Sequence, residues 1–185
     1  MAKVYDEVLM VLQKKYFGLT SKAVLSRMAS KLAKESVDIM RERTSDGKDV
    51  DGRKFGGYND GYPKAKKKAI QKAKGKTPYA AKKSGDFLRL SGKLFSDMSA
   101  KVIAVDQDLT SIRIKWLMYI KPRSVKKALG LQQNTGYTRS RKTYSKKSWR
   151  FFGLSTGGSQ RREEERRLLF TAQTTLDTIK RGTLV

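Results

Sequence analysis

The chain has 185 residues and a formal net charge of +25 at pH 7, with 42 Lys and Arg against 17 Asp and Glu. It contains neither Cys nor His, which excludes disulfide bonds, thiolate chemistry and the commonest general base and metal ligand. No apolar run approaches the roughly 20 residues of a membrane span, and the charge favours a polyanionic partner such as nucleic acid, an acidic protein surface or anionic lipid.

The length predicts a single domain over residues 1–185. A charged fraction of 32% and a mean hydropathy of −0.63 are polar for a compact monomer, which predicts long solvated loops or large assembly surfaces. Two basic segments, at about 44–85 and 121–150, are the parts predicted to be mobile. The first residues lack the form of a signal peptide, so we expect synthesis in the cytoplasm.

Two amphipathic helices are predicted at the start of the chain, both as packing elements rather than sites. Residues 3–16 would place four apolar side chains on one face of a short helix: Val4, Val8, Val11 and Leu12. Thr20 or Ser21 can cap a second helix that runs to about Arg43. The apolar stripe of this helix consists of Leu25, Met28, Leu32 and Ile39.

A loop and a lysine-rich segment follow. Residues 44–62 hold several turn dipeptides, among them Asp46-Gly47 and Asp51-Gly52, and three aromatic residues that could anchor the loop: Phe55, Tyr58 and Tyr62. Residues 63–83 carry nine lysines with almost no acidic residue: Lys64, Lys66, Lys67, Lys68, Lys72, Lys74, Lys76, Lys82 and Lys83. We interpret this segment as a solvated, partly helical arm that meets a partner; the alternative is a surface that only keeps the protein soluble.

A short apolar element and a β-hairpin come next. The element is marked by Leu88, Leu90, Leu94, Phe95 and Met98. Residues 101–106 and 110–117 predict two strands joined through Asp106–Asp108. In the second strand Ile112, Ile114 and Trp116 alternate with Ser111, Arg113 and Lys115. We therefore expect one face of the hairpin to lie in the core and the other to be solvent-exposed and basic.

The last third predicts a basic loop and a terminal helix. Residues 121–148 are expected to be loop, with Tyr137 and Tyr144 between the charged residues Arg139, Arg141, Lys142, Lys146 and Lys147. Residues 159–180 predict a helix with Leu168, Ala172, Leu176 and Ile179 on one face. Glu163 is placed to pair with Arg167, four positions further on.

Catalysis, cofactors and metals are not expected. The chain lacks the histidine of Ser-His systems, and Gly75-Lys76-Thr77 lacks the preceding glycine and strand of a phosphate-binding loop. Ile112 and Ile114 stand where a metal-dependent nuclease would need a second carboxylate after Asp106 and Asp108.

The order of five features resembles that of the virion-morphogenesis or tail-completion proteins of tailed phages. Asp51-Gly52-Arg53-Lys54-Phe55 and the lysine-rich segment come first; then Leu88, Ser91, Gly92 and Leu94; then the hairpin. Arg150-Phe151-Phe152-Gly153-Leu154-Ser155 precedes the terminal helix, where the family has Arg-x-Phe-Leu-Gly-Leu. The resemblance spans roughly residues 20–180.

This resemblance implies an α/β protein with a small antiparallel sheet packed by N-terminal and C-terminal helices. It also implies a virion protein of the phage neck, assembled in the host cytoplasm as a homo-oligomeric ring, commonly a hexamer, between the head connector and the tail tube. Non-specific contact with the genomic DNA and no contact with membrane are expected. The candidate interface residues are Lys64, Lys66, Lys67, Lys68, Arg139, Arg141, Lys142, Arg150, Phe151 and Phe152.

Three alternatives stay open at this stage. Phe151 and Phe152 could be interface anchors or could fill the core beneath the terminal helix. The basic arms could meet DNA or acidic neighbouring subunits. The whole chain could instead be a non-catalytic RNA- or DNA-binding protein, with tyrosines interleaved among its lysines and arginines, or another part of the virion.

Overall fold

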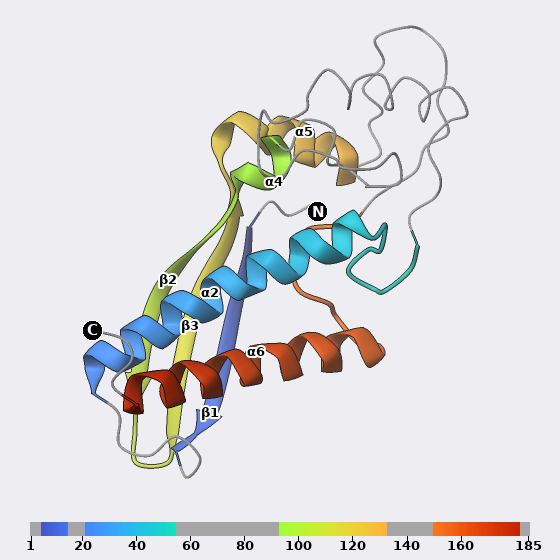
Figure 1. The fold of residues 1–185 in the computed structure, drawn as a ribbon. Coiled ribbons are helices and arrows are strands. Elements are labelled where there is room, and N and C mark those ends of the chain that lie inside the picture. Colours follow the sequence, from blue (N-terminus) through green and yellow to red (C-terminus); the bar gives the residue numbers. More distant parts are fainter. Residues whose placement is uncertain (1–4, 15–20, 55–92, 133–149, 182–185) are drawn as a thin grey trace, which may run out of the picture.

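A computed structural model describes residues 5–14, 21–54, 93–132 and 150–181 of the chain. Within these ranges, a three-stranded antiparallel sheet has two long helices on one of its faces (Figure 1). The strands are β1 (Tyr5–Gln13), β2 (Met98–Gln107) and β3 (Ser111–Ile120), in the order β1-β3-β2. The long helices are α2 (Lys22–Ser45) and α6 (Gly158–Lys180), and the short helices α4 (Lys93–Asp97) and α5 (Pro122–Gln132) lie at one end of the sheet. The predicted fold class is confirmed.

The predicted first helix is wrong, because residues 5–13 form the edge strand β1. Val8, Met10 and Leu12 turn toward the helices, whereas Leu9 and Val11 are exposed on the opposite side. The apolar run from Val8 to Leu12 satisfies both a helical and a two-residue period. The segment forms a strand because it pairs with β3 along its whole length, from Tyr5 opposite Tyr119 to Gln13 opposite Ser111.

Helix α2 begins and packs as its sequence predicts. The Ser21 side chain caps it by accepting a hydrogen bond from the Val24 N–H. All four residues of the predicted stripe are buried. Ser36 is buried as well, because its hydroxyl accepts a 2.8 Å hydrogen bond from the indole N–H of Trp116 and donates to carbonyl oxygens of its own helix. This contact fixes the helix over the centre of β3.

The hairpin is confirmed, with strands longer than expected and a turn about two residues later. Ile112, Ile114 and Trp116 are fully buried, whereas Arg113 is exposed. The Asp108 carboxylate closes the turn by accepting hydrogen bonds from the N–H groups of Thr110 and Ser111. These two bonds hold the pKa of Asp108 far below its usual value.

Part of the predicted loop over 121–148 is also wrong, because residues 122–132 form α5. Pro122 stands in the first turn, where its fixed φ suits a helix and its missing N–H is not needed. Ala128 is buried in the core and Val125 packs against it. The density of Lys and Arg in this stretch hides the helical spacing of these two apolar side chains. Residues 133–148 lie outside the described ranges.

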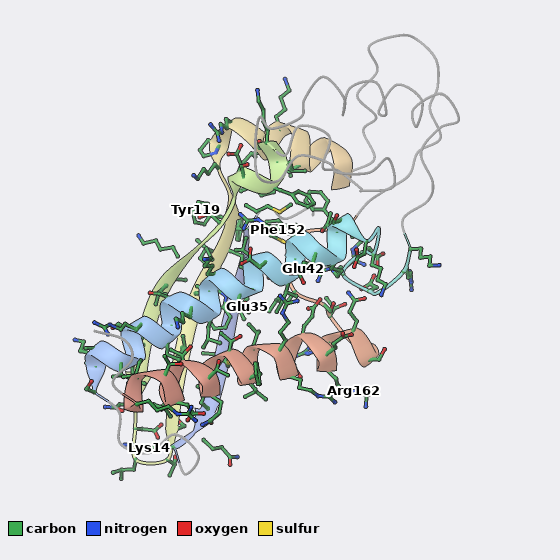
Figure 2. The ribbon with its side chains drawn as sticks, in the orientation of Figure 1. Lys14, Glu35, Glu42, Tyr119, Phe152 and Arg162 are labelled. Atoms are coloured by element: carbon green, nitrogen blue, oxygen red, sulfur yellow. The ribbon has the colours of Figure 1, made fainter. Side chains whose placement is uncertain are left out.

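Helix α6 forms as predicted, but its predicted ion pair does not. Leu168, Ala172 and Leu176 are buried against α2 and the sheet. Arg167 does not pair with Glu163: its guanidinium crosses to α2 and binds Glu35 and Glu42, which lie on the side of α2 that faces α6 (Figure 2). Hydrogen bonding to the Glu42 carboxylate, and then to Glu35, raises the pKa of Arg167 above its usual value.

Candidate functional site

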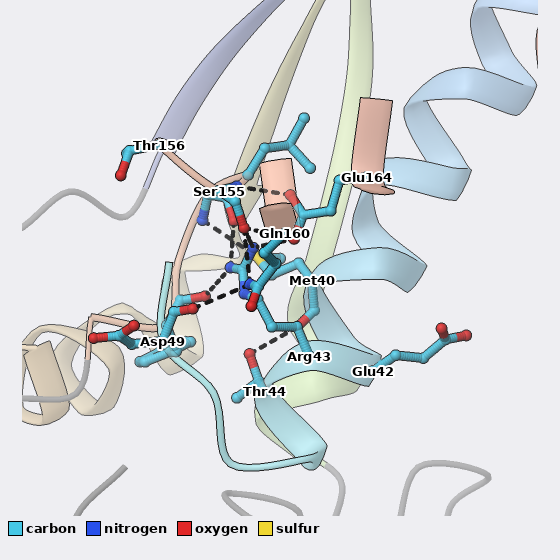
Figure 3. Close-up of polar contacts among 12 residues, drawn as sticks. Met40, Glu42, Arg43, Thr44, Asp49, Ser155, Thr156, Gln160 and Glu164 are labelled. Atoms are coloured by element: carbon cyan, nitrogen blue, oxygen red, sulfur yellow. Dashed lines mark hydrogen bonds and ion pairs between the residues drawn. The ribbon is translucent and has the colours of Figure 1, made fainter. Parts of the chain in front are cut away.

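Two of the motifs that carried the family resemblance meet in one buried junction (Figure 3). Arg43, in the last turn of α2, is its centre. The guanidinium donates to the carbonyl oxygens of Phe151 and Gly153, at 2.9 and 2.5 Å, and to the Glu164 carboxylate, at 2.8 Å. Arg43 therefore holds the segment before α6 against the end of α2, and Met40 of the same helix accepts a further hydrogen bond from the Gly153 N–H.

Both oxygens of the Glu164 carboxylate are hydrogen-bonded inside this junction. One of its oxygens accepts from Arg43 and from the Ser155 hydroxyl, and the other accepts from the Ser155 N–H at 2.7 Å. Gln160 donates a further 2.8 Å hydrogen bond to the Ser155 hydroxyl. A buried carboxylate with both oxygens hydrogen-bonded and a guanidinium beside it acts as a structural anchor.

The Asp51-Gly52 loop closes the same junction from the other side. The Val50 N–H donates to the Arg150 carbonyl at 2.8 Å, and the Thr156 N–H donates to the Val50 carbonyl at 3.2 Å. The Asp51 carboxylate accepts from the Arg150 guanidinium and from the Thr156 hydroxyl. Segments about 100 positions apart thus pair through backbone and side chains. Residues 44–54, inside the segment predicted to be mobile, are tied into the fold: 44 and 45 end α2, and 46–54 form this loop. Residues 55–85 lie outside the described ranges.

Gly153 lets the motif approach strand β1. Its φ is +101°, a left-handed conformation that a residue with a side chain adopts only with strain. A Cβ atom at this position would lie 2.9 Å from the Asp6 carboxylate, whose oxygen is also 3.4 Å from the Leu154 nitrogen and accepts its N–H. The glycine therefore sets the distance between the junction and the edge of the sheet.

A second polar cluster lies at the same end of the sheet, where β2 begins and β3 ends. The buried Asp97, at the end of α4, accepts hydrogen bonds from the Arg123 guanidinium and from the Ser124 hydroxyl, at 2.5 to 2.8 Å. The bond with Arg123 is the main reason that the pKa of Asp97 lies below its ordinary value of 3.8. This cluster joins α4 to α5 and is structural in the same sense as the Arg43 junction.

The sheet face opposite the helices is less basic than predicted. Arg113 and Lys115 lie on it, but both take part in ion pairs, with Asp108 and Glu7. Several apolar side chains share this face, and four are largely exposed: Tyr5 at 58%, Leu9 at 61%, Val11 at 54% and Ile103 at 48%. No described helix covers this face (Figure 1), which leaves a mixed apolar and charged surface of the kind that subunits bury on assembly.

The predicted interface residues divide into two groups. Arg150, Phe151 and Phe152 are described: Arg150 pairs with Asp51, while both phenylalanines belong to the hydrophobic core, with Phe151 fully buried. Their placement supports the alternative in which they fill the core. The others lie outside the described ranges: Lys64, Lys66, Lys67, Lys68, Arg139, Arg141 and Lys142.

Sequence reasoning missed Arg43, Ser155 and Glu164 as one cluster. A signal was present for Arg43, because it continues the apolar stripe of α2 four positions after Ile39. A cation on the core-facing stripe of a helix requires a buried acidic partner. The pattern alone does not identify that partner, since Glu163, Glu164 and Glu165 are equivalent in the sequence.

No group of three or more acidic residues that could hold a metal ion occurs among the residues that the structure describes. None of the described helices is long and apolar enough to cross a membrane. Comparisons with protein families, with curated proteins and with solved structures find no match to this chain.

Proposed function

We propose that this chain is a structural virion protein of the phage neck, which forms a ring that completes the tail and joins it to the head connector. The observation that carries the proposal is the uncovered sheet face, where Tyr5, Leu9, Val11 and Ile103 are exposed. Exposed β-strands with apolar side chains are stable against aggregation only where another surface covers them. A ring supplies that surface from the neighbouring copies.

The junction around Arg43 supports the neck assignment in a second way. The Asp-Gly loop and the Arg-Phe-Phe-Gly-Leu-Ser segment, which carry the resemblance, make direct contact through Val50, Asp51 and Arg150. Their joint role is to hold α6 on α2 through Arg43 and Glu164. Because these two motifs hold the helices together, we expect them to recur in proteins that share this fold and assembly, even where the surface residues differ.

The partners in this proposal are further copies of the chain, the head connector and the tail tube, without a cofactor or catalytic step. The described polar clusters around Arg43 and Asp97 are occupied by internal hydrogen bonds. The lysine-rich and arginine-rich segments at 63–83 and 137–150 then meet acidic neighbours or the DNA that passes through the neck.

The net charge of +25 favours one other candidate, a non-catalytic protein that binds RNA or DNA. Such a protein would bind nucleic acid tightly, with a steep dependence on salt, and would need no ring. The two candidates therefore differ in the state of the purified protein and in its place in the particle.

The test combines electron microscopy of the purified protein with mass spectrometry of purified virions. Rings of one defined size, together with the chain among the virion proteins, are the expected result. A protein that binds nucleic acid as a monomer and is absent from virions would overturn the proposal in favour of the second candidate.

A further inference from the structure

The free edge of β1 opens into a groove of about 620 Å³ whose second wall is α6. Six consecutive residues of β1, from Asp6 to Val11, line it. Because successive side chains of a strand point to opposite faces, a groove that touches all six runs along the edge of the strand. Among the described strands β1 pairs only with β3, so its outward N–H and C=O groups face this groove.

Part of the apolar surface that the fold leaves exposed lies at this edge. Leu9 and Val11 lie on β1, and Leu169 of α6 lines the groove at 47% exposure beside Phe170 at 69%. The wall also carries acidic side chains: Asp6, Glu7, Glu164 and Glu165. Three of these acids already pair with Lys115, Arg43 and Arg161, and the groove keeps an excess of negative charge on a strongly basic chain.

A second groove, of about 320 Å³, lies at the other edge of the same sheet. It follows β2 from Met98 to Val102 and is walled by α2, which contributes Lys34 and Arg41. The Arg41 guanidinium pairs with Asp38 and donates to the carbonyl oxygens of Phe95 and Met98, so Lys34 supplies the positive charge of this groove. None of its lining residues is acidic. The regular part of this edge ends at the bulge between Val102 and Ala104, so the five residues 98–102 offer a length similar to that of the groove along β1.

We propose that the β1 edge of one copy pairs with the β2 edge of the next, so that the ring is built on a sheet continuous from subunit to subunit. This inference rests on the proposed function and names its subunit contact. The edges differ in kind, since one is apolar and acidic and the other carries the exposed Lys34 and no acid. Such a head-to-tail contact generates a ring where its rotation closes. Main-chain hydrogen bonds and the burial of Leu9, Val11 and Leu169 supply the affinity.

Charge decides which edges meet. Exposed ion pairs add little affinity, but like charges brought together exclude the wrong pairing. Glu165 on the β1 groove and Lys34 on the β2 groove are both exposed, so either can be reversed without disturbing the core. A β1 edge that met another β1 edge would place acidic walls together, which disfavours the two-fold alternative.

The test reverses these two charges and measures ring formation by native mass spectrometry and electron microscopy. Glu165→Lys and Lys34→Glu should each reduce ring formation at least tenfold. Their combination on one chain, and an equal mixture of the two single variants, should both restore rings, because each contact then again joins opposite charges. Glu163→Lys and Lys31→Glu make the same charge changes on exposed positions that line neither groove, and they should assemble normally.

Rings that form equally well from every variant would overturn this contact and leave the proposed function standing. The proposed contact would also be overturned if Glu165→Lys failed to assemble while Lys34→Glu assembled normally. That result would indicate a contact in which Lys34 takes no part, such as a two-fold contact between β1 edges. Failure of the unaltered chain to form rings, together with its absence from virions, would remove the proposed function itself. Thermal unfolding is the control for folding: each variant should unfold at the same midpoint temperature as the unaltered chain.

Discussion

Arg43 of α2 and Glu164 of α6 form a 2.8 Å ion pair across 121 positions of the sequence, with their side chains 4% and 8% exposed. A buried pair of this kind adds little net stability over an apolar pair of the same shape, because both charges leave water. It nevertheless favours this register of α6 on α2, because Nη1 of Arg43 meets the Glu164 carboxylate only when the two side chains face each other. We infer that the pair fixes where α6 lies, and therefore the shape of the groove beside β1.

Removing one member of this pair should be costly. Glu164→Gln leaves the Arg43 guanidinium buried without a counter-charge, and we expect a loss of about 3–5 kcal/mol in the free energy of unfolding. Urea denaturation measures it. Glu165→Gln is the control, because Glu165 belongs to an exposed pair with Arg161 and should cost under about 1 kcal/mol. Equal losses in the two variants would mean that the junction is not buried.

Gly153→Ala should destabilise the junction for two reasons. The left-handed φ of +101° costs a residue with a side chain about 1–3 kcal/mol, and the new Cβ atom meets the Asp6 carboxylate at 2.9 Å. Gly157→Ala is the control for strain and crowding, because its φ of −175° suits any residue and no atom lies within 4 Å of a Cβ there. Its cost should be limited to the weaker N-cap that alanine gives α6. Thermal unfolding should separate the two variants by several degrees. Indistinguishable midpoints would exclude a strained backbone at Gly153.

The sequence predicts the elements whose apolar side chains follow one clear period. It fails where two periods fit, as in β1, and where dense Lys and Arg hide the period, as in α5. α2, α6 and the hairpin have a single clear pattern, and each is found where expected. The run from Val8 to Leu12 fits a helix and a strand equally well, and only its pairing with β3 decides. The junction at Arg43 could not be predicted in full, because its partners lie more than 100 positions away and local spacing carries no information about them.

The stability of the protein should depend on Asp97 at acid pH. The pKa of Asp97 is lower in the folded protein than its ordinary value of 3.8, so its contribution is present above pH 3.8 and is lost as the pH falls through and below that value. Asp97→Asn should cost on the order of 2 kcal/mol at pH 7, since hydrogen bonds to a charged acceptor are removed. The gap between the variant and the unaltered chain should narrow between pH 5 and about pH 3 in urea titrations. A gap that stays constant with pH would contradict the assignment.

The register of β3 can be tested with neighbouring residues. Ile114 is fully buried, so Ile114→Asp places an unpaired charge in the core and should cost at least about 3 kcal/mol. Arg113 lies on the exposed face in an ion pair with Asp108, and Arg113→Gln should change stability by under about 1 kcal/mol. Equal effects on the free energy of unfolding would indicate that the strand faces the other way.

Mutation of the lysine run in the segment 63–83 should distinguish between the two possible partners of the basic arms, DNA and an acidic neighbouring subunit. If this run meets DNA, replacing Lys66, Lys67 and Lys68 by Ala should weaken binding to all sequences alike. It should also reduce the salt slope by about one unit for each phosphate that is no longer neutralised. If it meets an acidic neighbouring subunit, the same change should block head–tail joining and leave DNA binding unaltered. We expect the second result, because a passage for DNA gains little from tight phosphate binding. Joining assays beside DNA titrations across a salt series measure both, and a variant normal in both would show that the run only keeps the protein soluble.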